Sequence, residues 1–116
     1  MTLDIRIEDT FNSPFIGEWD LPEDGSDLRL TIKDVERETI KNRKTNTESI
    51  QVVLYFEEDY KPMVLSARIN KDNIKQATGT GRTSKWVGKQ IQLYREPGTW
   101  FGKSGYAVRI RPYVSE

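Results

Sequence analysis

Short stretches in which apolar and polar residues alternate are the feature of this sequence that most restricts its fold. Leu28, Leu30 and Ile32 alternate with polar or charged neighbours, and the same period of two returns over residues 49–57. Successive side chains of a strand point to opposite faces, so each stretch is typical of a strand with one buried face. Turn-forming residues separate the stretches, and the sequence therefore predicts an all-β domain with little helix.

Five strands are expected, over residues 28–40, 49–57, 63–69, 90–94 and 106–111, with one short helix between the third and the fourth. Asn70 is expected to cap this helix, with Ile69 and Ile74 at the hydrophobic-staple positions, and Gly79 and Gly81 are expected to end it. One more helical turn is expected at residues 83–88, where Trp86 would seal the barrel end. This order predicts a five-stranded Greek-key barrel of the OB type, which the helix position favours over an SH3-like barrel or a small sandwich.

Three segments are expected to interrupt the regular strands. Val35 breaks the alternation of the first strand, as a β-bulge or a bend in a barrel would require. Residues 41–47 are expected to form an exposed hairpin loop and residues 97–105 a long glycine-rich loop. Residues 1–26 are expected to form an N-terminal arm that packs on the barrel through Phe15 or Trp19, with residues 27–116 as the OB-like barrel domain.

The residue composition argues against catalytic and metal chemistry. The 116-residue chain contains no cysteine and no histidine, which removes disulfides, thiolate ligands and the commonest general base. We therefore expect a protein that is not an enzyme and that has no cofactor and no metal. No apolar run approaches the roughly 18 residues of a membrane span, so a cytoplasmic protein without membrane contact is expected.

The charges are balanced in number but not in position. The chain has 18 basic and 18 acidic residues, yet the first 30 residues hold eight acids and two bases. The remaining residues hold sixteen bases and ten acids. This asymmetry permits a basic face on the body of the domain, although an ordinary mixed-charge surface would account for it equally well.

Two glycine-rich motifs resemble phosphate-binding loops but lack the required context. The run Gly102-Lys103-Ser104 has Pro97 where a P-loop needs glycine, and a strand instead of a helix is expected after it. The run Gly79-Thr80-Gly81 follows a helix instead of a strand and is interpreted as a helix terminator. The acidic residues at 23–24 and 57–59 are interpreted as solvated turns because their spacing matches no calcium loop.

Basic and aromatic residues fall together where an OB domain binds its ligands. Such domains use the face of strands two and three with the loops that join strands one to two and four to five. Single-stranded nucleic acid needs cations for its phosphates and flat side chains for its bases. The candidate nucleic-acid-binding residues are Lys41, Arg43, Lys44, Tyr55, Trp100, Phe101, Lys103, Arg109 and Arg111. The alternative is a protein-interaction or assembly subunit, or a homo-oligomer, in which Trp100 and Phe101 contact another chain or pack on the barrel.

Three phrases of the sequence resemble a family of small proteins from phage and prophage replication–recombination gene clusters. They are Ser13-Pro14-Phe15-Ile16, the stretch from Asn70-Lys71-Asp72-Asn73 to Lys85-Trp86-Val87-Gly88, and the closing Arg109-Ile110-Arg111-Pro112. The resemblance covers residues 13–112. It implies a phage context, single-stranded DNA as the ligand, and phage or host replication or recombination proteins as partners.

Overall fold

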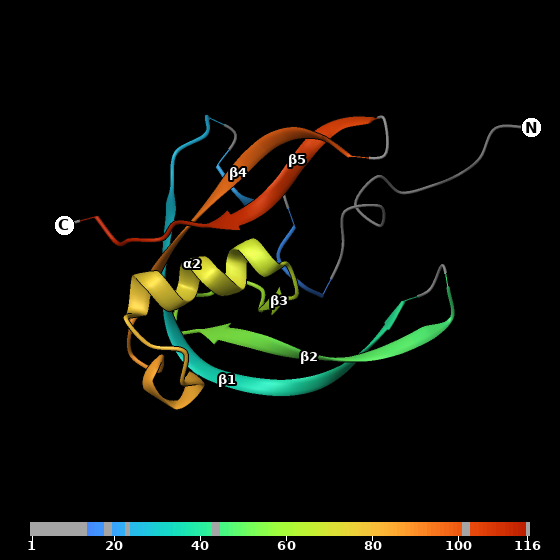
Figure 1. Ribbon diagram of the computed structural model, residues 1–116. Coiled ribbons are helices and arrows are strands. Elements are labelled where there is room, and N and C mark those ends of the chain that lie inside the picture. Colours follow the sequence, from blue (N-terminus) through green and yellow to red (C-terminus); the bar gives the residue numbers. More distant parts are fainter. Residues whose placement is uncertain (1–13, 18–19, 23, 43–44, 101–102, 116) are drawn as a thin grey trace, which may run out of the picture.

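The computed structural model describes residues 14–17, 20–22, 24–42, 45–100 and 103–115, and is mostly an antiparallel sheet with one α-helix. The strands are β1 (Leu28–Asn42), β2 (Thr47–Phe56), β3 (Met63–Leu65), β4 (Gln90–Trp100) and β5 (Lys103–Ile110). The helix α2 (Arg68–Thr78) and the 3-10 turn η2 (Thr83–Lys85) lie between β3 and β4 in the chain. The predicted all-β class is confirmed, and Figure 1 shows α2 lying across the sheet.

The longest strand, β1, is the centre of the sheet. The strand order is β3-β2-β1-β4-β5, with antiparallel pairing between β1 and each of β2 and β4. Strands β3 and β5 therefore stand at the two ends of the order. Closure of a barrel requires these two end strands to pair, and no pairing between them occurs among the described residues.

A bulge in β1 explains why its apolar pattern changes phase. Ile32 pairs with Phe56, whereas the next paired residue of β1 is Asp34, so Lys33 is the extra residue. The bulge allows Ile32, which is fully buried, and Val35, which packs against the core, to lie on the same side of the sheet. The irregularity predicted from Val35 is confirmed, two residues earlier in the strand.

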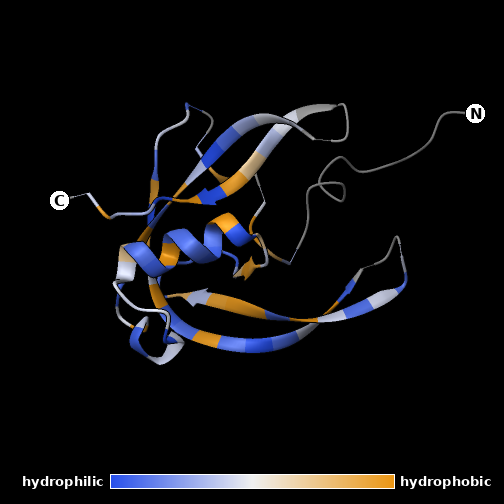
Figure 2. Ribbon diagram, in the orientation of Figure 1, coloured by the Kyte–Doolittle hydropathy of each residue, from blue (hydrophilic) through white to orange (hydrophobic). Residues whose placement is uncertain are grey.

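The core lies between the sheet and α2 and includes part of the N-terminal arm. Its buried members are Ile16, Leu21, Leu30, Ile32, Leu54, Phe56, Met63, Leu65, Ile74, Trp86, Ile91, Leu93 and Ile110. The Ile16 amide donates a hydrogen bond to the Pro62 carbonyl at 2.9 Å, which ties the arm to the segment before β3. Phe15 is half-buried, and Trp19 lies outside the described residues. Figure 2 shows apolar positions recurring along β1, β2 and β4.

The start of the helix differs from the prediction. Strand β3 ends at Leu65, the helix begins at Arg68, and Ala67 is an N-cap without a side-chain hydrogen bond. The predicted Asn70 cap is wrong because Asn70 is inside the helix and 3% exposed. Its Nδ2 donates to the Val108 carbonyl at 3.0 Å and its Oδ1 accepts from the Ile110 amide at 2.9 Å, so the side chain joins α2 to β5.

The predicted staple is also wrong, since Ile69 is 45% exposed. The end of the helix agrees with the prediction, because Gly79 takes a left-handed conformation (φ 79°) and its amide donates to the Lys75 carbonyl. The predicted turn at η2 is confirmed. Trp86 follows it, is buried, and donates from Nε1 to the Thr80 carbonyl at 2.8 Å.

Strands β4 and β5 extend where a long loop was expected. Residues 97–105 were expected to form a glycine-rich loop, but Pro97 pairs with Tyr106 and Gly98 with Gly105 as the ladder continues to Trp100 and Lys103. Paired backbone groups hold these glycines in strand conformation. In Figure 1 the β4–β5 and β1–β2 hairpins both project toward the same side of the molecule. No helix in the described part of the chain is long and apolar enough to cross a membrane.

Candidate nucleic-acid interface

Three of the predicted basic and aromatic loop residues, Lys41, Trp100 and Lys103, lie at the ends of the two hairpins. Lys41 is exposed near the end of β1 and pairs with Glu48 across the hairpin. Trp100 and Lys103 are the last pair of the β4–β5 ladder. Arg43, Lys44 and Phe101 lie outside the described residues, as do the side chains of Trp100 and Lys103. The structure thus brings Lys41 and the backbone of Trp100 and Lys103 to hairpin ends that project on one side.

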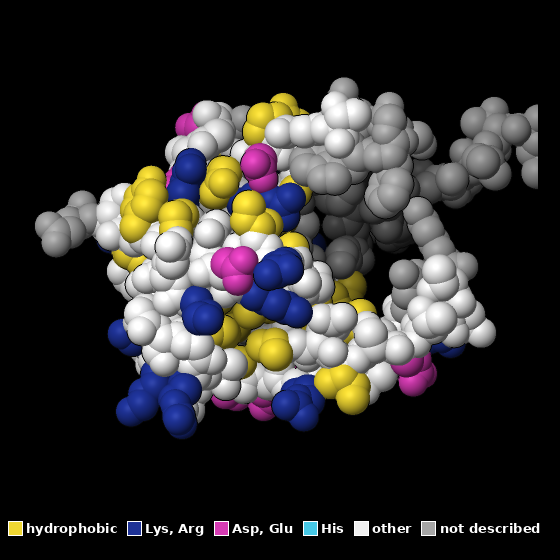
Figure 3. Space-filling view, viewed as in Figure 1, with side chains coloured by type: hydrophobic (Ala, Val, Ile, Leu, Met, Phe, Trp, Pro, Cys, Tyr) yellow, Lys and Arg dark blue, Asp and Glu magenta, His cyan; other side chains and the backbone are white. Residues whose placement is uncertain are grey.

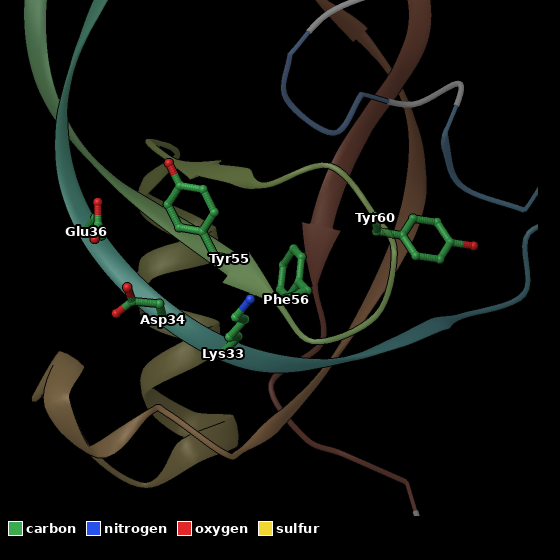
Figure 4. A pocket seen from close by; sticks show the side chains of 6 residues that line it. All are labelled: Lys33, Asp34, Glu36, Tyr55, Phe56 and Tyr60. Carbon is green, nitrogen blue, oxygen red and sulfur yellow. The ribbon is translucent and has the colours of Figure 1, made fainter.

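Tyr55 lies on the face of the β1–β2 hairpin that points away from the core. We call this the outer face; it carries Asp34, Glu36, Glu38, Tyr55 and the fully buried Val53, whereas the core-side face carries Val35, Val52 and Leu54. An open cavity of about 370 Å³ on the outer face is lined by Lys33, Asp34, Glu36, Tyr55, Phe56 and Tyr60. Figure 4 shows the carboxylates of Asp34 and Glu36 on the same side of the hairpin as the Tyr55 ring.

Carboxylates dominate the electrostatics around Tyr55. The Tyr55 hydroxyl donates a hydrogen bond to the Glu38 carboxylate, and this bond, together with desolvation and the nearby charges of Glu38, Glu36 and Asp34, raises the pKa of Tyr55 to about 12. Lys33 is the one basic residue among those that line the cavity. A nucleic-acid phosphate at this face would meet like charges, which disfavours the outer face as its binding surface.

Arg109 and Arg111 each form an ion pair within the chain. Arg109 Nε lies 2.5 Å from Glu96 Oε2, and its side chain is only 16% exposed. Arg111 donates to both oxygens of Asp27, from Nε at 3.0 Å and from Nη2 at 3.1 Å, and its guanidinium stacks 3.5 Å from the centroid of the Tyr94 ring.

The Asp27–Arg111 pair stabilises both charges. The hydrogen bonds from Arg111 lower the pKa of Asp27, and the same bonds raise the pKa of Arg111. Bidentate pairing and ring stacking are typical of a guanidinium with a structural role. The structure therefore places Arg109 of β5 and Arg111, which directly follows β5, in intramolecular pairs that a nucleic acid would have to compete with.

Three exposed basic residues that the sequence analysis did not single out lie on the other side of the sheet. Arg37 is exposed on β1, and Lys71 and Lys75 are exposed on α2. None of the three is in an ion pair found among the described residues. Figure 3 shows Lys and Arg side chains over α2 and the turn after it, with an apolar patch beside them. The sequence signal for Arg37 was its position one residue out of phase with the acids Asp34, Glu36 and Glu38.

No group of three metal-ligating side chains that could hold a metal ion occurs in the part of the chain that the structure describes. Comparison of the chain with protein-family models, with curated proteins and with solved structures finds no match in any of the three. The resemblance to phage proteins thus stays a prediction that the sequence alone supports.

Proposed function

We propose that this chain is a non-catalytic module that binds single-stranded DNA and that its sheet is an OB-type barrel. Two features support the OB assignment. The central strand β1 pairs with both β2 and β4, and the helix α2 comes between β3 and β4. A role in phage replication or recombination, with proteins of those processes as partners, is part of the proposal on the strength of the sequence resemblance alone.

The observation that carries the proposal is the common direction of the two hairpins. OB domains bind oligonucleotides between the loops that join strands one to two and four to five. Here those loops end the two hairpins in Figure 1, with Lys41 near one end and Trp100 at the other. Cations that contact phosphates and aromatic rings that stack on bases are the two requirements of a single-strand site.

The proposal is tested by titrating fluorescently labelled oligothymidine with the full chain at low salt and recording anisotropy. Because the chain has no net charge, we expect modest affinity that falls steeply as salt is added. Trp100→Ala is expected to weaken binding by about 1–3 kcal/mol, nearly independently of salt, since a stacked ring contributes little counterion release.

Urea unfolding of the same variant separates stacking from stability. An unfolding midpoint like that of the wild type, with weaker oligonucleotide binding, supports direct stacking by Trp100. If the wild type shows no anisotropy change at several hundred micromolar protein, the proposed function is wrong.

A protein-interaction subunit is the second candidate, and exposed apolar side chains on both hairpins favour it. Ile50 on β2 is 67% exposed and Tyr106 on β5 is 47% exposed. Desolvated apolar and aromatic anchors dominate the energy of protein interfaces. Light scattering discriminates the two candidates: a dimer that Ile50→Ser or Tyr106→Ser dissociates supports the subunit, and a monomer that binds oligothymidine supports the DNA-binding module.

A further inference from the structure

The β1–β2 hairpin carries opposite charges on its two faces. On the outer face of β1 are Asp34, Glu36 and Glu38, and strand alternation places Arg37 and Lys41 on the core-side face. Arg37 pairs with Val52, which packs against the core, so the assignment of the faces follows from the register. Beyond the core, this face of β1 carries the two bases Arg37 and Lys41, and Glu48 of β2 lies opposite Lys41.

The basic surface continues from the hairpin onto the helix. Val52, Leu65 and Trp86 line a shallow groove of about 310 Å³ together with Lys71, Lys75 and Gly81. Lys71 and Lys75 are one helical turn apart, roughly 5–6 Å between their Cβ atoms, and both are exposed. Val52 therefore connects the groove beside Lys71 and Lys75 with Arg37, its register partner on β1, and Lys41 lies four residues further along the same face.

Acidic residues are few along this path. Glu48 is the register partner of Lys41 near the end of the hairpin, and Asp72 on α2 lies 4.0 Å from Arg68. From residue 66 to residue 92 the chain holds six bases, and Asp72 is its one acid. Ile50, two residues from Val52 on the same face, pairs with Thr39 and adds an exposed apolar surface beside Arg37 and Lys41.

We propose that single-stranded DNA lies along the core-side face of the β1–β2 hairpin and over the Lys71–Lys75 side of α2, and that the outer face around Tyr55 does not contact it. This inference rests on the proposed function and adds which side of the sheet the bound DNA follows. Arg37, Lys41, Lys71 and Lys75 contact phosphates, and Val52 and Ile50 lie against sugars and bases.

An acidic peptide is the competing ligand for this surface. Two lysines beside an apolar groove would suit a peptide with one apolar side chain between carboxylates. Such a peptide would fill the groove and leave Arg37 and Lys41 unused, four residues and about 13 Å apart along β1. The extent of the basic surface beyond the groove favours a longer polyanion.

The experiment compares two exposed basic residues of β1 that lie on opposite faces. Binding of labelled oligothymidine to the full chain is measured over a series of salt concentrations for wild type, Arg37→Ala and Lys33→Ala. A third variant combines Arg37→Ala with Lys71→Ala and Lys75→Ala. Each phosphate contact on a single strand contributes about 0.7 to the slope of log K against log salt. We expect the slope to become shallower by about 0.7 for Arg37→Ala and by about 2 for the triple variant, with no change for Lys33→Ala.

The outcomes separate this inference from the proposed function. If the wild type binds and the triple variant keeps its slope, or if Lys33→Ala changes the slope as much as Arg37→Ala, the assignment to the core-side face is wrong and DNA binding stands. If the wild type does not bind oligothymidine at all, both the inference and the proposed function are wrong. Displacement of the oligonucleotide by polyglutamate of equal charge would also overturn the inference and assign the surface to an acidic protein.

Discussion

The outer face and the core-side face of the β1–β2 hairpin are built by alternate residues of the same strand, β1, and these residues differ in the sign of their charge. Asp34, Glu36 and Glu38 surround Tyr55 on the outer face, and Arg37 and Lys41 are on the core-side face. Because neighbours in a strand point to opposite sides, the acids at even-numbered positions and the bases at odd-numbered positions from residue 34 to residue 41 lie on different surfaces. The net charge of zero for the chain therefore conceals a basic and an acidic surface on the same hairpin.

The structure also shows which basic side chains could contact a phosphate without first breaking an ion pair within the chain. Arg109 is in β5 and Arg111 directly follows it, yet each is paired with a carboxylate of the same chain. Arg37, Lys71 and Lys75 are exposed and in no ion pair that the described residues show. Sequence composition counts these five residues alike, whereas only the unpaired ones release counterions when a phosphate binds.

The largest expected effect tests how far the core extends along the core-side face. Leu54 is fully buried and Ile50, four residues earlier on the same face of β2, is 67% exposed. Leu54→Ala should lower the free energy of unfolding by about 2–5 kcal/mol, since it leaves a cavity. Ile50→Ala should change it by less than about 0.5 kcal/mol. Urea unfolding of both variants checks this, and equal losses would show that the exposed end of the face belongs to the core.

A smaller effect is expected from the residue that fixes α2 over the sheet. Asn70→Ala removes both hydrogen bonds to β5 and leaves the Val108 carbonyl and the Ile110 amide without these partners. The expected loss in the free energy of unfolding is about 1–3 kcal/mol. Asn73 makes one bond, from Nδ2 to the Ile110 carbonyl at 2.7 Å, and is half-buried, so Asn73→Ala is the milder control. A wild-type unfolding curve for Asn70→Ala would contradict the role given to this side chain.

The smallest expected effect concerns Tyr55 on the outer face and is measured by a pH titration. The pKa of Tyr55 is raised from 10.0 to about 12, so its neutral form is favoured in the folded protein. The stabilisation is complete below pH 10 and is lost as the pH rises through about 12. Tyrosinate absorbance should show one tyrosine with a raised pKa. Tyr55→Phe should remove this titration, and Glu38→Gln should move its pKa toward the ordinary value of 10.0. Titration of Tyr55 at that ordinary value in the wild type would mean that the outer face lacks the acidic character described.

The strands were predictable from sequence because alternation is a local property, and the bulge at Lys33 was predictable because the apolar phase changes at Val35. The start of the helix was not. Asn70 has the chemistry of a cap, but its partners Val108 and Ile110 are about forty residues away in sequence, and only the tertiary structure brings them together. The extension of the β4–β5 hairpin was not predicted either, because the pairing between the two strands overrides the turn preference of its glycines.

The residue types of the candidate site could be predicted from the sequence, but the faces on which they lie and the partners that they bind could not. The sequence placed Tyr55 and Lys41 on one binding surface, whereas the structure places them on opposite faces of the hairpin. The Glu38 carboxylate that binds Tyr55 comes from another strand, and Arg111 meets Asp27 across 84 residues. Such partners depend on the register between strands, which the alternation within one strand does not determine.

The central claim is that DNA lies on the core-side face, and an NMR titration with oligothymidine tests it most directly. The methyl groups of Ile50 and the ring of Tyr55 report on the two faces of β2. Our account predicts that the Ile50 methyl signals shift progressively with added oligonucleotide and that the Tyr55 ring signals stay in place. A titration that moves the Tyr55 ring and leaves the Ile50 methyl groups unchanged would contradict it.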